Sequence, residues 1–180
     1  CSIGTAGGGA LGNTNGINLQ GTSNEIGGLD PGDRNIISGN SVGVNVSAGS
    51  GHFVKGNHIG TDATGSRAIA NTAAGLFITS SVTGLTIGSS AEGSGNIVSG
   101  NGGSGIVIDG SSGVIALGNH IGTDAGGTLA IANSVRGLII GTGSSSNNVG
   151  NGTANGRNII SGNGSSGLSI SGVSTSDNTA

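Results

Sequence analysis

The sequence predicts an all-β fold, a three-sided parallel β-solenoid of about six coils with about 30 residues in each coil. Three observations predict it. Glycine supplies 42 of 180 residues without a three-residue period, which excludes collagen. A pattern of glycine, aliphatic, any residue, aliphatic recurs six times, and two more short aliphatic segments lie between successive copies. Such short strands cannot bury a face alone, but they can when each stacks on its equivalent in the next coil.

The recurring pattern is the first strand of each coil. Its alternation has period two, so we expect both aliphatic residues to face the core and the residue between them to face outward. The six copies occupy 16–19, 43–46, 75–78, 105–108, 137–140 and 167–170. The predicted core residues are Ile17, Leu19, Val44, Val46, Leu76, Ile78, Ile106, Ile108, Leu138, Ile140, Leu168 and Ile170.

Two further columns predict the second and third strands. The second-strand column is an aliphatic residue followed by glycine, at Ile26, Ile59, Ile87, Ile121 and Val149. The third-strand column is NIISGN at 35 and 158, NIVSGN at 96, and AIAN at 68 and 130.

An asparagine precedes each first strand by three or four residues. Stacked amides can hydrogen-bond along the axis, and asparagine tolerates the backbone of a sharp corner. We therefore expect a ladder inside one corner, formed by Asn13, Asn40, Asn71, Asn101, Asn133 and Asn163.

The segments NIISGN, GNHIGTD and GLFI resemble the right-handed parallel β-helix repeats of large secreted and surface proteins of bacteria, a fold shared with pectate lyases. The resemblance covers essentially the whole chain. It implies right-handed coils and an extracellular or cell-surface location.

The heptapeptide GNHIGTD occurs at 56 and again at 118, two coils later. His58 and His120 should then lie about 10 Å apart, too far to share one metal ion. We interpret each copy as a repeated corner, in which an outward-facing histidine stands on the surface beside a turn stabilised by Asp62 or Asp124.

Acidic residues give two candidate sites. Glu92 lies in the loop of the intervening coil that we take to correspond to the GNHIGTD turns. Asp62, Glu92 and Asp124 then form a possible column of cation ligands, with calcium as the ion, and otherwise no cofactor is expected. Asp30 and Asp33, with the neighbouring Arg34, are the candidate catalytic residues of a polysaccharide lyase or glycoside hydrolase, whose two carboxylates would flank a groove. The chain has no Trp or Tyr to stack on sugars, so we expect a protein that is not an enzyme and keep the enzyme as the alternative.

Composition excludes other classes. The net charge is −3, and five Lys or Arg are scattered singly, so no nucleic-acid surface is predicted. No apolar run approaches the roughly 20 residues of a membrane span. An ice-binding solenoid would need Thr-x-Thr in successive coils, which is absent. Phe77, Val107 and Ile139 face outward in successive first strands and predict a lateral contact stripe.

The two ends of the sequence are in phase. Counting from Gly167 as from Gly43, position 181 would take the register of Cys1, the single cysteine. We therefore expect one solenoid domain over 1–180 without caps, either part of a longer solenoid or a subunit that stacks head to tail. The predicted role is a structural, filament-forming or adhesin-like module. Its expected partners are copies of itself, adjoining repeats and surface glycans.

Overall fold

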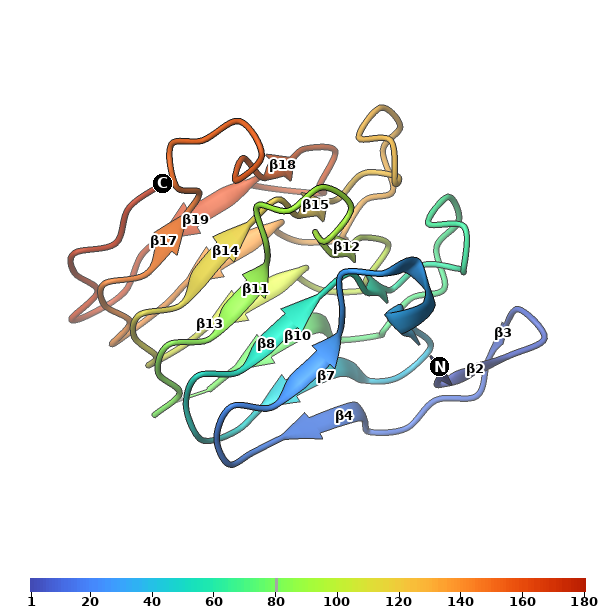
Figure 1. Ribbon diagram of the computed structural model, residues 1–180, viewed down its shortest axis with the longest axis horizontal. Helices are drawn as coiled ribbons and strands as arrows, with labels where there is room; N and C mark the ends of the chain where they lie inside the picture. Colours follow the sequence, from blue (N-terminus) through green and yellow to red (C-terminus); the bar gives the residue numbers. More distant parts are fainter. Residues whose placement is uncertain (80) are drawn as a thin grey trace.

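The computed structural model describes residues 1–79 and 81–180, and it confirms the predicted class. Three parallel sheets, of six, six and five strands, enclose one core. Neighbouring strands of a sheet come from successive coils (Figure 1). The chain winds from the coil that contains β4 to the coil that contains β19, so equivalent residues of successive coils lie side by side.

The first sheet has the strands that the recurring glycine–aliphatic pattern predicts. Its strands pair in the expected register: Leu76 pairs with Val44 on one side and with Ile106 on the other. In chain order the strands are β4 (Asn15–Leu19), β7 (Val42–Val46), β10 (Ala74–Ile78), β13 (Ile106–Ile108), β16 (Leu138–Ile140) and β19 (Leu168–Ile170).

The second and third sheets differ from the expected columns. The second sheet contains β5 (Glu25–Gly27), β8 (Phe53–Lys55), β11 (Thr86–Gly88), β14 (Ile115–Leu117) and β17 (Asn148–Val149). The third sheet contains β1 (Ser2–Ile3), β6 (Ile36–Ile37), β9 (His58–Ile59), β12 (Ile97–Val98), β15 (His120–Ile121) and β18 (Ile159–Ile160).

The assignment of Ile59 and Ile121 to the second strand was therefore wrong, because both pair with Val98 in the third sheet. The AIAN segments at 68 and 130 are not strands of the solenoid. Each is the returning arm of a hairpin, with antiparallel bridges between Thr61 and Ala68 and between Thr123 and Ala130. In the two coils that contain these hairpins, the second-sheet strands are β8 and β14, which the sequence did not lead us to expect.

The coils alternate between two kinds of excursion, and both kinds flank the third sheet. One kind is a loop that precedes β6, β12 or β18; the loop before β6 contains the 3-10 turn η1 (Pro31–Asp33). The other kind is a hairpin that follows β1, β9 or β15, and in the first of these β2 (Thr5–Ala6) pairs with β3 (Gly9–Ala10). Because the strands are parallel, loops and hairpins emerge at opposite edges of this sheet. The hairpins project from the body of the solenoid in Figure 1.

Most of the predicted core residues are fully buried. Val44, Leu76, Ile106 and Leu138 have no exposed surface. Toward the ends of the solenoid Ile17 and Leu168 are only partly buried, and Ile170 is 43% exposed. Ile170 differs from the buried Ile140 because no further coil covers it.

The six asparagines expected at one corner form a continuous hydrogen-bonded column. In each step the side-chain Nδ2 of one residue donates to the Oδ1 of the next, over 2.8 to 3.2 Å. A second column of the same kind runs before the third sheet, and the sequence analysis missed it. Its members are Asn35, Asn57, Asn96, Asn119 and Asn158, joined at 2.9 to 3.1 Å. The sequence signal for this column was the asparagine directly before every third-sheet strand except β1, which follows Cys1.

A third corner, before the second sheet, has mixed composition. Asn147 donates to Asn178 Oδ1 at 2.9 Å, whereas Leu85 and Val114 fill the same place in other coils. His52 also lies there, fully buried. Its Nδ1 accepts from the Asn24 N–H and its Nε2 donates to the Ala48 carbonyl, so both ring nitrogens are used in holding the corner.

Candidate functional site

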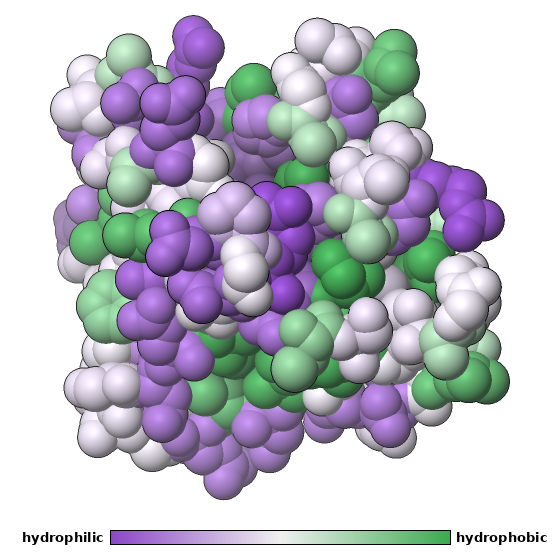
Figure 2. Space-filling view, turned by 45° about the vertical axis from the view of Figure 1, so that its right-hand side comes forward, coloured by the Kyte–Doolittle hydropathy of each residue, from purple (hydrophilic) through white to green (hydrophobic). Residues whose placement is uncertain are grey.

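A cleft lies on the outer face of the third sheet, between the two rows of excursions. Its volume is about 570 Å³. Outward-facing His58, Ile97, His120 and Ile159 line its floor. Figure 2 brings the hairpin side of the molecule forward, and the surface there is a patchwork of hydrophilic residues with small hydrophobic areas.

Both floor histidines are held by the hairpin that follows them. Nδ1 of His58 lies 3.1 Å from the Asp62 carbonyl oxygen, and Nδ1 of His120 lies 3.1 Å from that of Asp124. Because a carbonyl oxygen can only accept, Nδ1 carries the proton in each ring. In a neutral ring Nε2 is then an acceptor that is free of this contact.

The expectation that these histidines stand on the surface was wrong for His58, which is only 4% exposed, and His120 is half-buried. Both side chains do point away from the core. The hairpin folds back over the outer face, however, and its Gly65 approaches the His58 ring closely. Residues that follow the strand by several positions therefore cover it.

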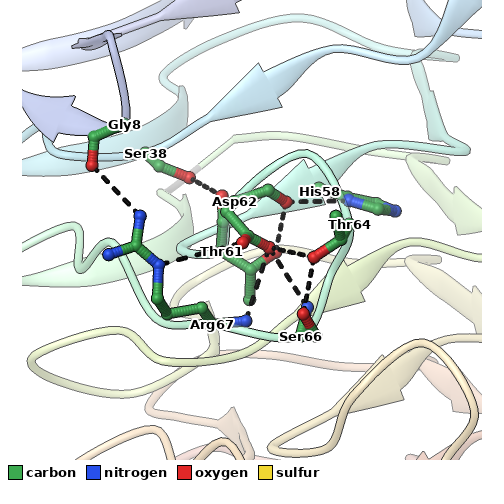
Figure 3. A network of polar contacts seen from close by, with 8 residues as sticks. All are labelled: Gly8, Ser38, His58, Thr61, Asp62, Thr64, Ser66 and Arg67. Carbon is green, nitrogen blue, oxygen red and sulfur yellow. Dashed lines mark hydrogen bonds and ion pairs between the residues drawn. The ribbon is translucent and has the colours of Figure 1, made fainter.

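Asp62 and Asp124 organise their hairpins. The Oδ1 of Asp62 accepts from the Thr64 hydroxyl at 2.8 Å and from the Ser66 N–H at 3.2 Å (Figure 3). The Oδ1 of Asp124 accepts from two backbone N–H groups, of Thr128 and Leu129, at 2.8 and 2.9 Å. Both aspartates therefore stabilise their turns, as expected from the sequence.

These bonds lower both carboxyl pKa values. Burial raises the pKa of Asp62, but hydrogen bonds from Thr64, Ser66 and Arg67 outweigh it and hold that pKa below its ordinary value. For Asp124, the N–H groups of Leu129 and Thr128 lower the pKa. Both groups are therefore anionic at neutral pH.

The hairpins also contact each other and the first hairpin. The Ala125 N–H donates to the Gly65 carbonyl at 3.2 Å, which joins two hairpins across the intervening coil. The Arg67 guanidinium lies between Asp62, at 3.9 Å, and the Gly8 carbonyl, at 3.3 Å (Figure 3). The three hairpins are thus a connected row, and the two that contain Thr64 and Ala125 line one wall of the cleft.

The opposite wall carries the charged groups that line the cleft. Arg34 and Arg157 each lie two residues before a third-sheet strand and line the cleft, and Glu92 lies on the loop between them. Arg34 Nε donates to the Gly56 carbonyl at 3.3 Å. Asp30 and Asp33, the candidate acids, lie on the exposed surface around η1 and do not line the cleft.

The expected acidic column is not assembled. Glu92 lies on a loop before β12, whereas Asp62 and Asp124 lie on hairpins after β9 and β15, at the opposite edge of the sheet. The part of the chain that the structure describes contains no group of three His, Cys, Asp or Glu placed to hold a metal ion. The correspondence drawn between the Glu92 loop and the GNHIGTD turns was wrong, because the two excursion types alternate.

The outward stripe on the first sheet has the expected register. Phe77 pairs with Val107, and Val107 pairs with Ile139, and all three side chains are half-buried. Whether the stripe makes a lateral contact stays a prediction.

No family model, no curated protein and no solved structure matches this chain. The fold itself defines its class: a parallel β-solenoid repeat protein of six stacked coils. Among residues 1–79 and 81–180 there is no helix with the length and apolar character that a membrane span needs.

The pKa of His58 gives a testable pH dependence. Burial, the largest effect, lowers this pKa below its ordinary 6.5, although the hydrogen bond to the Asp62 carbonyl raises it. Above pH 6.5 the ring is neutral in both the folded and the unfolded chain. As the pH falls below 6.5 the unfolded chain binds the proton first, so the free energy of unfolding decreases until the folded ring is also protonated.

We therefore expect urea unfolding, followed from neutral to mildly acidic pH, to show a smaller loss of stability for His58→Gln than for the wild type. The Asp and Glu titrations are common to both proteins and cancel in the difference. Parallel pH profiles for the two proteins would contradict the assignment.

Proposed function

We propose that the chain is a structural β-solenoid module whose terminal coils stack on further coils of the same kind. The observation that carries the proposal is the change in burial along equivalent positions of the first sheet. Ile140 has no exposed surface, whereas its neighbour in the next coil, Ile170, is 43% exposed. Covering such a residue with another coil would remove apolar surface from water.

The two end faces present matching groups. β4 and β19 are the outer strands of the first sheet, so each has one edge whose backbone groups are unpaired within that sheet. In the first asparagine column every Nδ2 donates toward the coil of higher number, so Asn163 Nδ2 would meet Asn13 Oδ1 of a second copy. In the third corner, Asn178 would meet Asn24 in the same way. The partner is a second copy of this chain or adjoining coils of the same protein.

Electron microscopy of the purified protein tests stacking between copies. We expect rods with an axial repeat of about 29 Å, which is six coils at about 4.8 Å each. Ile170→Lys should shorten them, because it places a charge in the interface while changing a side chain that is exposed in the single chain. The matched control is Phe53→Lys, since Phe53 is 40% exposed, as Ile170 is, but lies on β8, which is not an outer strand of its sheet. Particles of single-chain size for the wild type, or equal rod lengths for both variants, would remove self-stacking.

A polysaccharide lyase or glycoside hydrolase is the alternative from another class, and a non-catalytic glycan-binding surface is related to it. The cleft on the third sheet favours this alternative, because it gathers His58, His120, two arginines and Glu92. Since Asp30 and Asp33 lie outside the cleft, Glu92 is the acid on which such chemistry would depend. A location outside the cell or on its surface belongs to the proposal, supported by the resemblance to bacterial surface repeats.

A further inference from the structure

The loop between β17 and β18 contains an asparagine–glycine pair, Asn151-Gly152, with unusual surroundings. In such a pair the backbone nitrogen of the glycine can attack the side-chain Cγ of the asparagine, because glycine has no side chain to obstruct the approach. The sequence has five asparagine–glycine pairs, at 15, 101, 151, 155 and 163. The structure distinguishes one of them.

The side-chain carbonyl of Asn151 is held by two donors from one residue. Its Oδ1 accepts from the Thr153 N–H at 3.1 Å and from the Thr153 hydroxyl at 2.7 Å. Two donors on a carbonyl oxygen polarise the carbonyl and stabilise the negative charge that develops on this oxygen when a nucleophile adds. The Thr153 groups therefore act on Asn151 as an oxyanion hole acts on an acyl group.

The nucleophile is also available at this pair. Asn151 is exposed to solvent, and within the described residues no hydrogen bond engages the Gly152 N–H. Gly152 has φ +73°, and no atom lies within 4 Å of a Cβ added there, so this side of the residue is open. The loop can therefore adjust to bring the nitrogen onto Cγ.

The other pairs lack this combination. The N–H groups of Gly102, Gly156 and Gly164 donate to backbone carbonyls at 2.8, 3.2 and 2.9 Å. Asn101 and Asn163 are also members of the first ladder, which fixes their amides. Asn15 lies in strand β4, whose extended backbone is paired with β7.

We propose that Asn151 is a site of intramolecular deamidation. The Gly152 nitrogen forms a bond to Asn151 Cγ, the Cγ–Nδ2 bond breaks, and ammonia leaves with the proton of the Gly152 N–H. Water then opens the resulting succinimide at one of its two carbonyl carbons and gives aspartate or isoaspartate. The net reaction consumes one water and releases one ammonia, and it needs no other reactant.

The product changes the charge of one wall of the molecule. Asn151 and Arg157 line the same surface pocket of about 490 Å³, and Arg157 also lines the cleft on the third sheet. A carboxylate at 151 would be attracted to the Arg157 guanidinium. The reaction thus adds a carboxylate to a pocket that is already lined by the Arg157 guanidinium.

Incubation of the folded protein at mildly alkaline pH, followed by peptide mapping with mass spectrometry, tests the proposal. We expect Asn151 to deamidate on the order of tenfold faster than Asn101, Asn155 or Asn163. The same chain in denaturant should lose this preference, because the contacts with Thr153 are then absent. Equal rates at all the pairs in the folded protein would overturn the proposal.

Two variants of Thr153 separate activation from loop exposure. Thr153→Val removes the hydroxyl donor and should lower the rate at Asn151 severalfold, whereas Thr153→Ser keeps the hydroxyl and should keep the rate. Circular dichroism checks that both variants retain the fold. Equal rates for the two variants would show that the hydroxyl does not activate the amide, and would overturn the proposed mechanism.

Discussion

Replacing Asn101 with alanine is expected to lower the free energy of unfolding by about 3–5 kcal/mol, because it leaves several buried polar groups without partners. The side chain has no exposed surface. Its Nδ2 donates to Asn133 Oδ1 at 2.8 Å and to the Ile59 carbonyl at 3.2 Å, and its Oδ1 accepts from Asn71 Nδ2 at 2.9 Å. Neither water nor a neighbouring side chain can replace these contacts in the closed interior of the solenoid.

Chemical denaturation of the wild type and the variant measures this loss. Asn18→Ala is the matched control, because Asn18 accepts comparable hydrogen bonds, from Asn45 at 3.0 Å and from Ser47 at 3.1 Å, on the exposed outer face. Its loss should be within about 0.5 kcal/mol, since water replaces the partners. Similar losses for the two variants would show that the ladder does not act through burial.

Replacing Gly88 with alanine should cost about as much, through backbone displacement rather than lost hydrogen bonds. Gly88 ends β11 with φ +79°, and a Cβ there would lie 2.0 Å from the Leu117 carbonyl oxygen and 2.6 Å from Asn119 Oδ1. The left-handed backbone alone costs about 1–2 kcal/mol for alanine. The overlap adds to this, because the next coil must move away and the second ladder must break locally.

Gly93→Ala separates the two contributions. Gly93 lies in the loop that follows Gly88 and has φ +74°, but it has no atom within 4 Å of an added Cβ. We expect this variant to lose only the conformational 1–2 kcal/mol, roughly, and Gly88→Ala to lose about 2 kcal/mol or more beyond that. Thermal unfolding of both variants provides the comparison, and equal losses would show that coil-to-coil contact at Gly88 imposes no limit.

The candidate site was predictable only in part. Asp62 and Asp124 could be assigned to turns, because Gly-Thr-Asp is a local turn signal. Each carboxylate accepts hydrogen bonds from residues no more than five positions away in the sequence. The pairing of Asp30 and Asp33 with a groove failed for the opposite reason. Whether a loop borders a cleft depends on its neighbours in other coils. The position of Asp30 and Asp33 close to Arg34 in the sequence does not identify those neighbours.

The sequence by itself determined the three-sided coil, the register of the first sheet and the ladder through Asn71 and Asn101. All three recur once in each period of about 30 residues, and the ladder asparagine always lies three or four residues before the first-strand glycine, so periodicity alone identifies them. Only the tertiary structure decided that Ile59 belongs to the third sheet, that His58 is covered and that a cleft lies there. An isoleucine followed by glycine looks the same on either side of a coil. Its side is set by where the chain inserts a loop or a hairpin, and therefore by contacts between residues that are about 30 positions apart.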